Sequence, residues 1–361
     1  MRFRRLCVLL LLAGVAPSLF ADATIQYTTS VKLGPVIAAA ATLSKKPLNI
    51  TPPAPTSRTM RLKNGKIEQD GGAFTGIFDS KNSQVTLIDP TRKLFATTSL
   101  EELIGQVIAS MPPAPPNASP QVKMFLQSMA MTYASEKTGR TGMTLGLATE
   151  ETEMTASLNV TLPPSMQALL PNASAQPGAP VTLLKFVVQM WYPAQAEVAR
   201  VPALGEVASF WSDQNSASGS LTGLIAGMQK LLVKYPGLAS GLAAMTADMF
   251  KDRGAMLKMD IDVYAPVLAQ LAPMMKAHGM PSFDLSAPVL ELSTEAVEVS
   301  SAPIDDSVFV APSGYRETPI ADFLRAERTP AGARAGRLGG EVEPATPPSP
   351  ADGQGLGRLP F

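Results

Sequence analysis

The sequence predicts an α+β fold in which helices cover an antiparallel β-sheet. Short segments that alternate apolar and polar residues recur along the chain with turn residues between them, which is typical of antiparallel strands. Two stretches, near residues 99–134 and 218–277, also carry apolar residues at helical spacing. With 361 residues and 45% hydrophobic content, the chain can bury a large core. No flexible boundary divides it into two halves, so we expect one domain over residues 24–320.

The first 23 residues have the features of a secretory signal peptide. Three arginines precede an apolar run that is too short to span a bilayer, and Ala21 and Ala23 offer two cleavage sites. We therefore expect residues 1–23 to be removed, so that the mature chain begins at Asp22 or Thr24. The mature protein is expected in the periplasm of a bacterial envelope, or secreted, and without a transmembrane segment.

The charge balance argues against nucleic acid as a partner. The chain has 30 basic and 30 acidic residues, and loss of the three leader arginines leaves 27 basic residues and a net charge of about −3. No basic patch of the kind that binds nucleic acid or an anionic membrane is visible.

Cysteine and histidine each occur once, which removes most metal-binding and nucleophilic chemistry. Cys7 precedes the apolar run of the leader, whereas a bacterial lipoprotein carries its acylated cysteine just after such a run, so we expect no lipid anchor. His278 lies at an expected helix end, where it is interpreted as an exposed or capping residue. Asp260 and Asp262 fall on one polar face of a strand. We expect no catalytic residue, no cofactor, no metal site and no enzymatic activity.

The first hundred residues predict an antiparallel meander. Residues 23–33 are rich in β-branched and aromatic side chains, and residues 58–63 alternate apolar with basic side chains. Asn64-Gly65 is a hairpin turn signal. Three further strands are expected over residues 74–79, 84–89 and 93–98.

Helices are expected after this meander. Ser99 and Glu102 form a capping-box pattern that opens the first helix, which should stop before Pro112. A second helix is expected over residues 122–134. Later helices are expected between residues 218 and 252 and over residues 267–277.

The second half also contains strands, of which one is unusually apolar. Strands are expected over residues 157–162, 181–192, 257–263 and 289–299. Within 181–192, one side presents only apolar or aromatic residues, and such a strand is expected to be central, with that face packed or turned to an apolar cavity. The candidates for lining a ligand cavity are Leu184, Phe186, Val188, Met190 and Tyr192.

The C-terminal segment, residues 325–361, is rich in alanine, glycine, arginine and proline and has almost no apolar pattern. We expect this tail to be disordered. Truncation after Thr318 is expected to leave the melting temperature nearly unchanged.

Four segments, taken in order, resemble one known family. They are Met60-Arg61-Leu62-Lys63 with residues 85–95, residues 138–146 with a Thr-Gly strand turn, Met190-Trp191-Tyr192-Pro193, and residues 304–316 with a closing Pro-Ser-Gly-Tyr-Arg. This set resembles a family of bacterial exported proteins, a domain-of-unknown-function group related to the outer-membrane lipoprotein carriers (LolA/LolB-like). The resemblance implies a half-barrel, which is a strongly curved antiparallel sheet closed on its concave side by helices. It implies no catalytic residues.

Two classes of function follow. The first is a non-enzymatic periplasmic binding or carrier protein that shelters an apolar ligand, such as an acyl chain, between the sheet and the helices. The alternative is a structural or interaction component of the bacterial envelope with a filled core, no small-molecule ligand and an envelope protein as its partner. The 18 methionines fit either class, because methionine fills irregular cores and also lines adaptable apolar sites.

Overall fold

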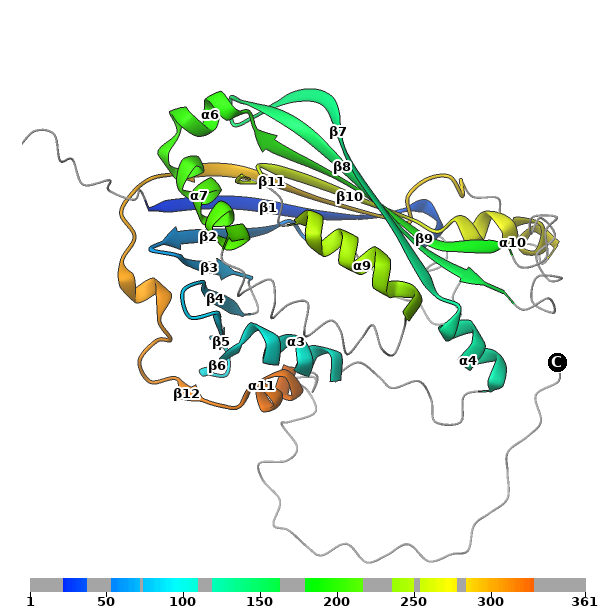
Figure 1. Cartoon of the computed structure of the whole chain (residues 1–361), viewed down its shortest axis with the longest axis horizontal. Coiled ribbons are helices and arrows are strands. Elements are labelled where there is room, and N and C mark those ends of the chain that lie inside the picture. The colour runs from blue at the N-terminus through cyan, green and yellow to red at the C-terminus, as the bar shows by residue number, and fades with distance from the viewer. Residues whose placement is uncertain are drawn as a thin grey trace, which may run out of the picture.

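An open sheet of 12 strands organises the protein (Figure 1). Its neighbours are antiparallel, except that β12 pairs in parallel with β6. The strands are β1 (Ala23–Leu33), β2 (Thr56–Lys63), β3 (Lys66–Asp70), β4 (Thr75–Asp79), β5 (Gln84–Asp89), β6 (Leu94–Ser99), β7 (Ala130–Thr144), β8 (Leu147–Thr161), β9 (Pro180–Pro193), β10 (Lys258–Tyr264), β11 (Leu290–Ser300) and β12 (Arg316–Glu317). Across the sheet their order is β12-β6-β5-β4-β3-β2-β1-β11-β10-β9-β8-β7.

The computed structural model describes eight ranges of the chain. They are residues 22–37, 53–71, 74–109, 119–162, 179–216, 236–249, 254–277 and 284–327. The predicted leader up to Ala21, the expected helix over residues 218–235, His278 and the tail beyond residue 327 lie outside the described residues.

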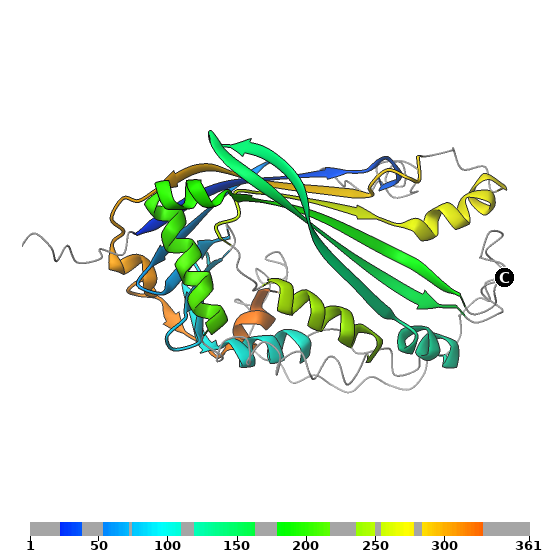
Figure 2. The ribbon, with the colours of Figure 1, turned by 45° about the horizontal axis from the view of Figure 1, so that its top comes forward.

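The sheet curves strongly, and α7 and α9 lie on its concave side (Figure 2). The helices are α3 (Leu100–Ala109), α4 (Pro120–Gln127), α6 (Gln195–Arg200), α7 (Pro202–Ser216), α9 (Pro236–Met249), α10 (Pro266–Ala277) and α11 (Ile320–Glu327), with a 3-10 turn, η1 (Asp306–Phe309). This architecture confirms the predicted α+β half-barrel. In the described ranges, no helix has the length and apolar character needed to cross a membrane.

Local signals set the first meander as predicted. Asn64 and Gly65 both have positive φ, at 52° and 79°, as a type I′ hairpin turn requires, and they join β2 to β3. The backbone N–H of Glu102 donates to Ser99 Oγ at 3.1 Å, which forms the predicted cap of α3. The Glu102 carboxylate accepts a hydrogen bond from Thr98 rather than completing the capping box.

The prediction of a helix over residues 122–134 is wrong in its second half. α4 ends at Gln127, and β7 begins at Ala130. Met131 and Tyr133 fit an alternating strand pattern as well as a helical one. This segment forms a strand because it pairs with β8 from Ala130 onward. The short apolar spacing could not distinguish the two, because the deciding contacts are long-range.

The sequence prediction missed α6 and α7. Pro202 stands at the first position of α7, where its fixed φ favours a helix start. Three buried side chains of α7, Leu204, Val207 and Phe210, recur at a spacing of three, which is also compatible with other structures. α7 packs on β1 and β11 and carries the largest core cluster, whose fully buried members include Ala23, Ile25, Leu62, Leu204, Val207 and Leu257.

α9 lies against β7 because two glycines allow close contact. A Cβ at Gly237 would lie 2.1 Å from the carbonyl oxygen of Met129, the residue before β7, and a Cβ at Gly241 would lie 2.4 Å from that of Met131 in β7. The Tyr133 hydroxyl of β7 donates to Asp248 Oδ2 of α9 at 2.6 Å. The two glycines, four residues apart on α9, therefore allow the helix to pack closely on the strand.

α11 belongs to the folded domain, which corrects the predicted tail boundary at Arg325. Ile320 and Phe323 are 5% and 1% exposed and pack with Ala96. The Arg92 guanidinium lies over the Phe323 ring, 5.7 Å from its centroid. Truncation after Thr318 would remove this cluster, so the expectation that it is harmless does not fit the structure.

We predict that Phe323→Ala lowers the free energy of unfolding by about 3–5 kcal/mol, because it empties a fully buried site. Arg325→Ala, on the exposed side of the same helix, should change it by less than about 0.5 kcal/mol. Denaturant unfolding of the two variants tests this placement. Truncation after Glu327 should leave the melting temperature within a degree or two of the parent.

The turn after β5 predicts a pH-dependent contribution to stability. Burial acts to raise the pKa of Asp89, but hydrogen bonds from the Arg92 backbone and guanidinium outweigh burial and lower it below 3.8. A depressed carboxyl pKa stabilises the fold above its unfolded value, and this contribution disappears as the pH falls through the native pKa. Asp89→Asn should therefore cost about 1 kcal/mol at neutral pH. The difference from the parent should shrink below pH 3.8 in acid unfolding curves.

The contacts of Asp22 and Ala23 favour one of the two predicted cleavage sites. Asp22 Oδ2 accepts a hydrogen bond from the Ile304 N–H at 2.5 Å and lies 3.6 Å from Lys63 Nζ, and Ala23 is fully buried. Cleavage after Ala23 would remove these contacts. If the predicted leader is removed, we expect N-terminal sequencing to find Asp22 first, and a start at Thr24 would contradict this.

Candidate functional site

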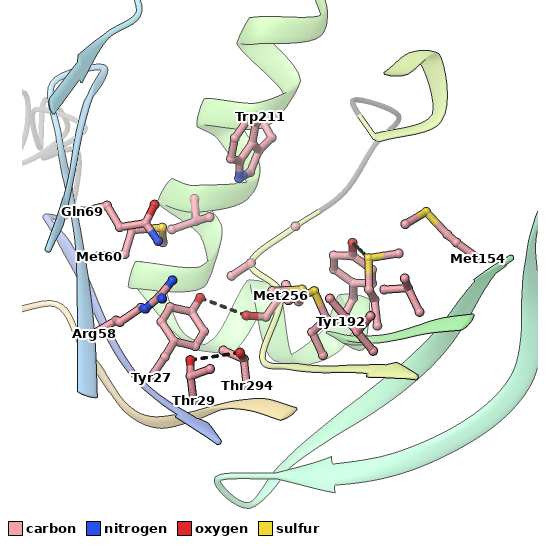
Figure 3. A pocket seen from close by; sticks show the side chains of 17 residues that line it. Tyr27, Thr29, Arg58, Met60, Gln69, Met154, Tyr192, Trp211, Met256 and Thr294 are labelled. Atoms are coloured by element: carbon pink, nitrogen blue, oxygen red, sulfur yellow. Dashed lines mark hydrogen bonds between the residues drawn. The ribbon is translucent and has the colours of Figure 1, made fainter. Parts of the chain in front are cut away.

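The concave face holds a pocket of about 540 Å³ (Figure 3). Seven strands that are neighbours in the sheet contribute to it: β3, β2, β1, β11, β10, β9 and β8. The helix α7 and the segment before β10 complete the lining. Its 17 lining residues are Tyr27, Thr29, Arg58, Met60, Gln69, Met154, Val188, Met190, Tyr192, Val207, Trp211, Gly254, Ala255, Met256, Met259, Ile261 and Thr294.

The alternation of side chains along the strands creates the apolar wall. Val188, Met190 and Tyr192 of β9 share one face of the sheet, since side chains two apart point the same way. On β10, Met259 stands opposite Met190 and Ile261 opposite Val188. These cross-strand pairs make one continuous apolar surface.

α7 forms the opposite wall. Val207 is fully buried and belongs to both the core cluster and the pocket lining. The Trp211 side chain points toward the pocket (Figure 3) and is held edge-on by Phe210, with ring centroids 5.2 Å apart. The helix therefore fills one end of the concave face and leaves the pocket beside it.

The other side of the pocket is polar. The Tyr27 hydroxyl donates to the Met256 carbonyl oxygen at 3.0 Å, and the hydroxyls of Thr29 and Thr294 are 3.0 Å apart. Burial, reinforced by Tyr192, raises the pKa of Tyr27 well above its usual range, so its phenol stays neutral. Arg58 enters the lining directly opposite Tyr27 in the strand register.

The structure brings together three of the five residues predicted for a ligand cavity. Val188, Met190 and Tyr192 line the pocket, and β9 is central, between β8 and β10. Leu184 and Phe186 are half-buried and are not among the lining residues. A ligand-binding role for all five stays a prediction.

Sequence reasoning missed most of the remaining lining. Tyr27, Arg58, Trp211 and Met256 come from segments that only folding brings together. Trp211 carried the one usable signal, because it follows Val207 at helical spacing, in a segment to which no helix was assigned. Nothing local marks Arg58 as a pocket residue.

Residues 138–146, quoted for the family resemblance, contain a bulge and then the hairpin turn. The turn itself is Leu145-Gly146, with φ of 56° and 72°, while the pairing of β7 with β8 shifts between Lys137 and Thr141. The bulge lets Arg140 and Thr138 both bind the buried carboxylate of Glu151. Both contacts are made to Glu151 Oε2, whereas Oε1 is buried without a hydrogen-bond partner among the described residues. These groups border a second, polar hollow beside the first pocket.

Gly142 and Trp191 also belong to this part of the sheet. A Cβ at Gly142 would lie 2.9 Å from the Trp191 ring, so the glycine makes room for the indole. Trp191 follows Met190 on β9 and therefore lies on the opposite face from the pocket.

No protein-family model matches the chain, and no curated protein matches it either. A solved LolA superfamily protein from Nitrosomonas europaea aligns with 81% of this chain and 91% of its own, at 7% identity and a TM-score of 0.21. A domain from Vibrio parahaemolyticus, described as an outer membrane lipoprotein-sorting protein, aligns with 80% of this chain and 89% of its own, at the same identity and TM-score. At this similarity, fold and function have to be argued from the geometry of this chain.

We predict that Met190→Ala costs less than about 1 kcal/mol of stability, although Met190 is only 5% exposed, because the lost side chain borders space that already exists. Leu257→Ala, at a fully buried core position, should cost about 2–5 kcal/mol. Chemical denaturation of both variants makes the comparison. Equal losses would show that the pocket position is packed like the core.

Proposed function

We propose that the protein is a non-enzymatic binding or carrier protein of the bacterial periplasm that shelters an apolar, acyl or lipid-like ligand. The observation that carries this proposal is the pocket between the concave face of the sheet and α7. Its volume of about 540 Å³ falls in the range of about 300–1,000 Å³ that is usual for small-molecule sites.

The composition of the wall supports an apolar ligand. Five methionines line the pocket: Met60, Met154, Met190, Met256 and Met259. Methionine side chains are flexible and polarizable, so they can adapt to ligands of varied shape. This gives five of the 18 methionines a role other than core filling.

The polar groups of the lining support holding rather than catalysis. They are tyrosine, threonine, glutamine, tryptophan and arginine side chains, and the described lining includes no Asp, Glu, His, Lys, Cys or Ser. Acid–base or nucleophilic catalysis would need a reactive group positioned beside a partner that takes or gives a proton. Arginine stays protonated, and burial keeps Tyr27 protonated.

Native mass spectrometry of protein purified from its own periplasm tests the proposal. We expect an additional mass that organic extraction removes and that lipid analysis identifies as an acyl compound. A mass equal to that of the mature chain, together with no binding of a fluorescent fatty-acid probe, would favour the alternative of a structural envelope component.

A pocket-filling variant makes the test specific. Val188→Trp should fill the cavity and abolish probe binding with little loss of stability. Val187→Trp places the same side chain on the other face of β9 and should leave binding unchanged. Equal binding by both variants would place the probe outside the pocket.

A further inference from the structure

We infer that the ligand is an anionic amphiphile whose carboxylate or phosphate head binds Arg58 while its apolar tail lies along β10, β9 and β8. This inference rests on the proposed function and adds the class of head group.

The charge of the pocket is unusual. Arg58 is the one charged residue among the described lining residues, and no carboxylate accompanies it. Within the part of the chain that the structure describes, the Arg58 side chain forms no hydrogen bond or ion pair, and the residue is exposed. Other arginines do pair with carboxylates, namely Arg61, Arg92, Arg140, Arg200 and Arg325.

The neighbouring strands direct acids away from Arg58. Gln69 of β3 lines the pocket, whereas the adjacent Glu68 faces the other way and pairs with Arg61 at 2.8 Å. Asp70, on the other side of Gln69, also lies on the face opposite the pocket by strand alternation, and neither acid is among the lining residues. An anionic group would supply the missing partner.

The donors at this end suit an oxyanion. The Arg58 guanidinium offers a planar set of N–H donors, which bind carboxylate and phosphate oxygens as charge-assisted pairs. The Gln69 side-chain amide adds N–H donors from β3, the strand next to β2, which carries Arg58. In Figure 3 the Arg58 and Gln69 side chains extend from neighbouring strands into the same end of the pocket.

The pocket changes from polar to apolar across the sheet. Arg58 lies on β2 and Met190 on β9, and three strands, β1, β11 and β10, separate them. At about 4.8 Å between neighbouring strands, this is a path of roughly 19 Å along the sheet. A head held at β2 therefore leaves its tail on the methionine-rich wall formed by Met259, Met190 and Met154.

The test measures binding of four probes with the same dodecyl tail by isothermal titration calorimetry: laurate, dodecyl phosphate, dodecanol and dodecylamine. The parent should bind laurate, dodecyl phosphate or both at least tenfold more tightly than dodecanol, and dodecylamine most weakly. Arg58→Gln should weaken binding of the anions about tenfold or more and leave dodecanol unchanged, because it removes only the charge-assisted contact. The better of the two anions identifies carboxylate or phosphate as the natural head.

Lys32→Gln is the matched control. It removes one positive charge from β1, the strand next to β2. Lys32 lies on the face of β1 that points away from Thr29 and the pocket, and its side chain is 75% exposed. It should leave all four affinities unchanged. An equal loss in this variant would attribute the effect to net charge and overturn the role of Arg58.

Two outcomes separate this inference from the proposed function. If dodecanol binds as tightly as the anions and Arg58→Gln changes nothing, the head-group inference fails while the apolar pocket stands. If no probe binds the parent, the proposed function fails, and the inference fails with it.

Discussion

The packing of α7 against one end of the concave face determines the rest of the structure. A curved sheet exposes an apolar inner surface that water penalises, so helices have to cover it. Leu204 and Val207 of α7 fill one end completely, together with Ile25 of β1 and Leu62 of β2. Because α7 covers only that end, the inner surface of β8, β9 and β10 beyond Trp211 borders space. Core and pocket are thus two parts of one surface, and Val207 contributes to both.

Much of the sheet could be predicted from local patterns, because each strand carries its own alternation and its own turn signals. The expected ranges 23–33 and 84–89 agree with β1 and β5 to the residue. β9 is expected to be central because one of its faces carries only apolar or aromatic residues, while the other mixes apolar with polar ones. The prediction failed where two patterns fit the same residues, as at 130–134, and where a helix of moderate amphipathicity, α7, lacked a clear periodic stripe.

The pocket could be foreseen only on β9, since its other walls come from strands far apart in sequence. Arg58 shows the limit most clearly, because alternation places it with Met60, but only the folded sheet brings it to the same pocket as Met190.

The pocket combines two kinds of surface. Its apolar side consists of adaptable side chains, and its polar side consists of neutral hydroxyls that already bond to one another or to the backbone. Arg58 differs from both because its charge is unmatched inside the pocket. Arg58 is exposed at the edge of the pocket, and in the proposed site for an anionic amphiphile it would orient the ligand.

The central claim is that an acyl chain enters the space between α7 and β9. The two tryptophans allow a direct test, because Trp211 lines the pocket and Trp191 lies on the opposite face of β9. Bromine on an acyl chain quenches tryptophan fluorescence only at close contact. Titration of brominated fatty acid should therefore strongly quench Trp211 in the Trp191→Phe variant and leave Trp191 bright in the Trp211→Phe variant. Quenching of Trp191 alone, or of neither residue, would contradict the account.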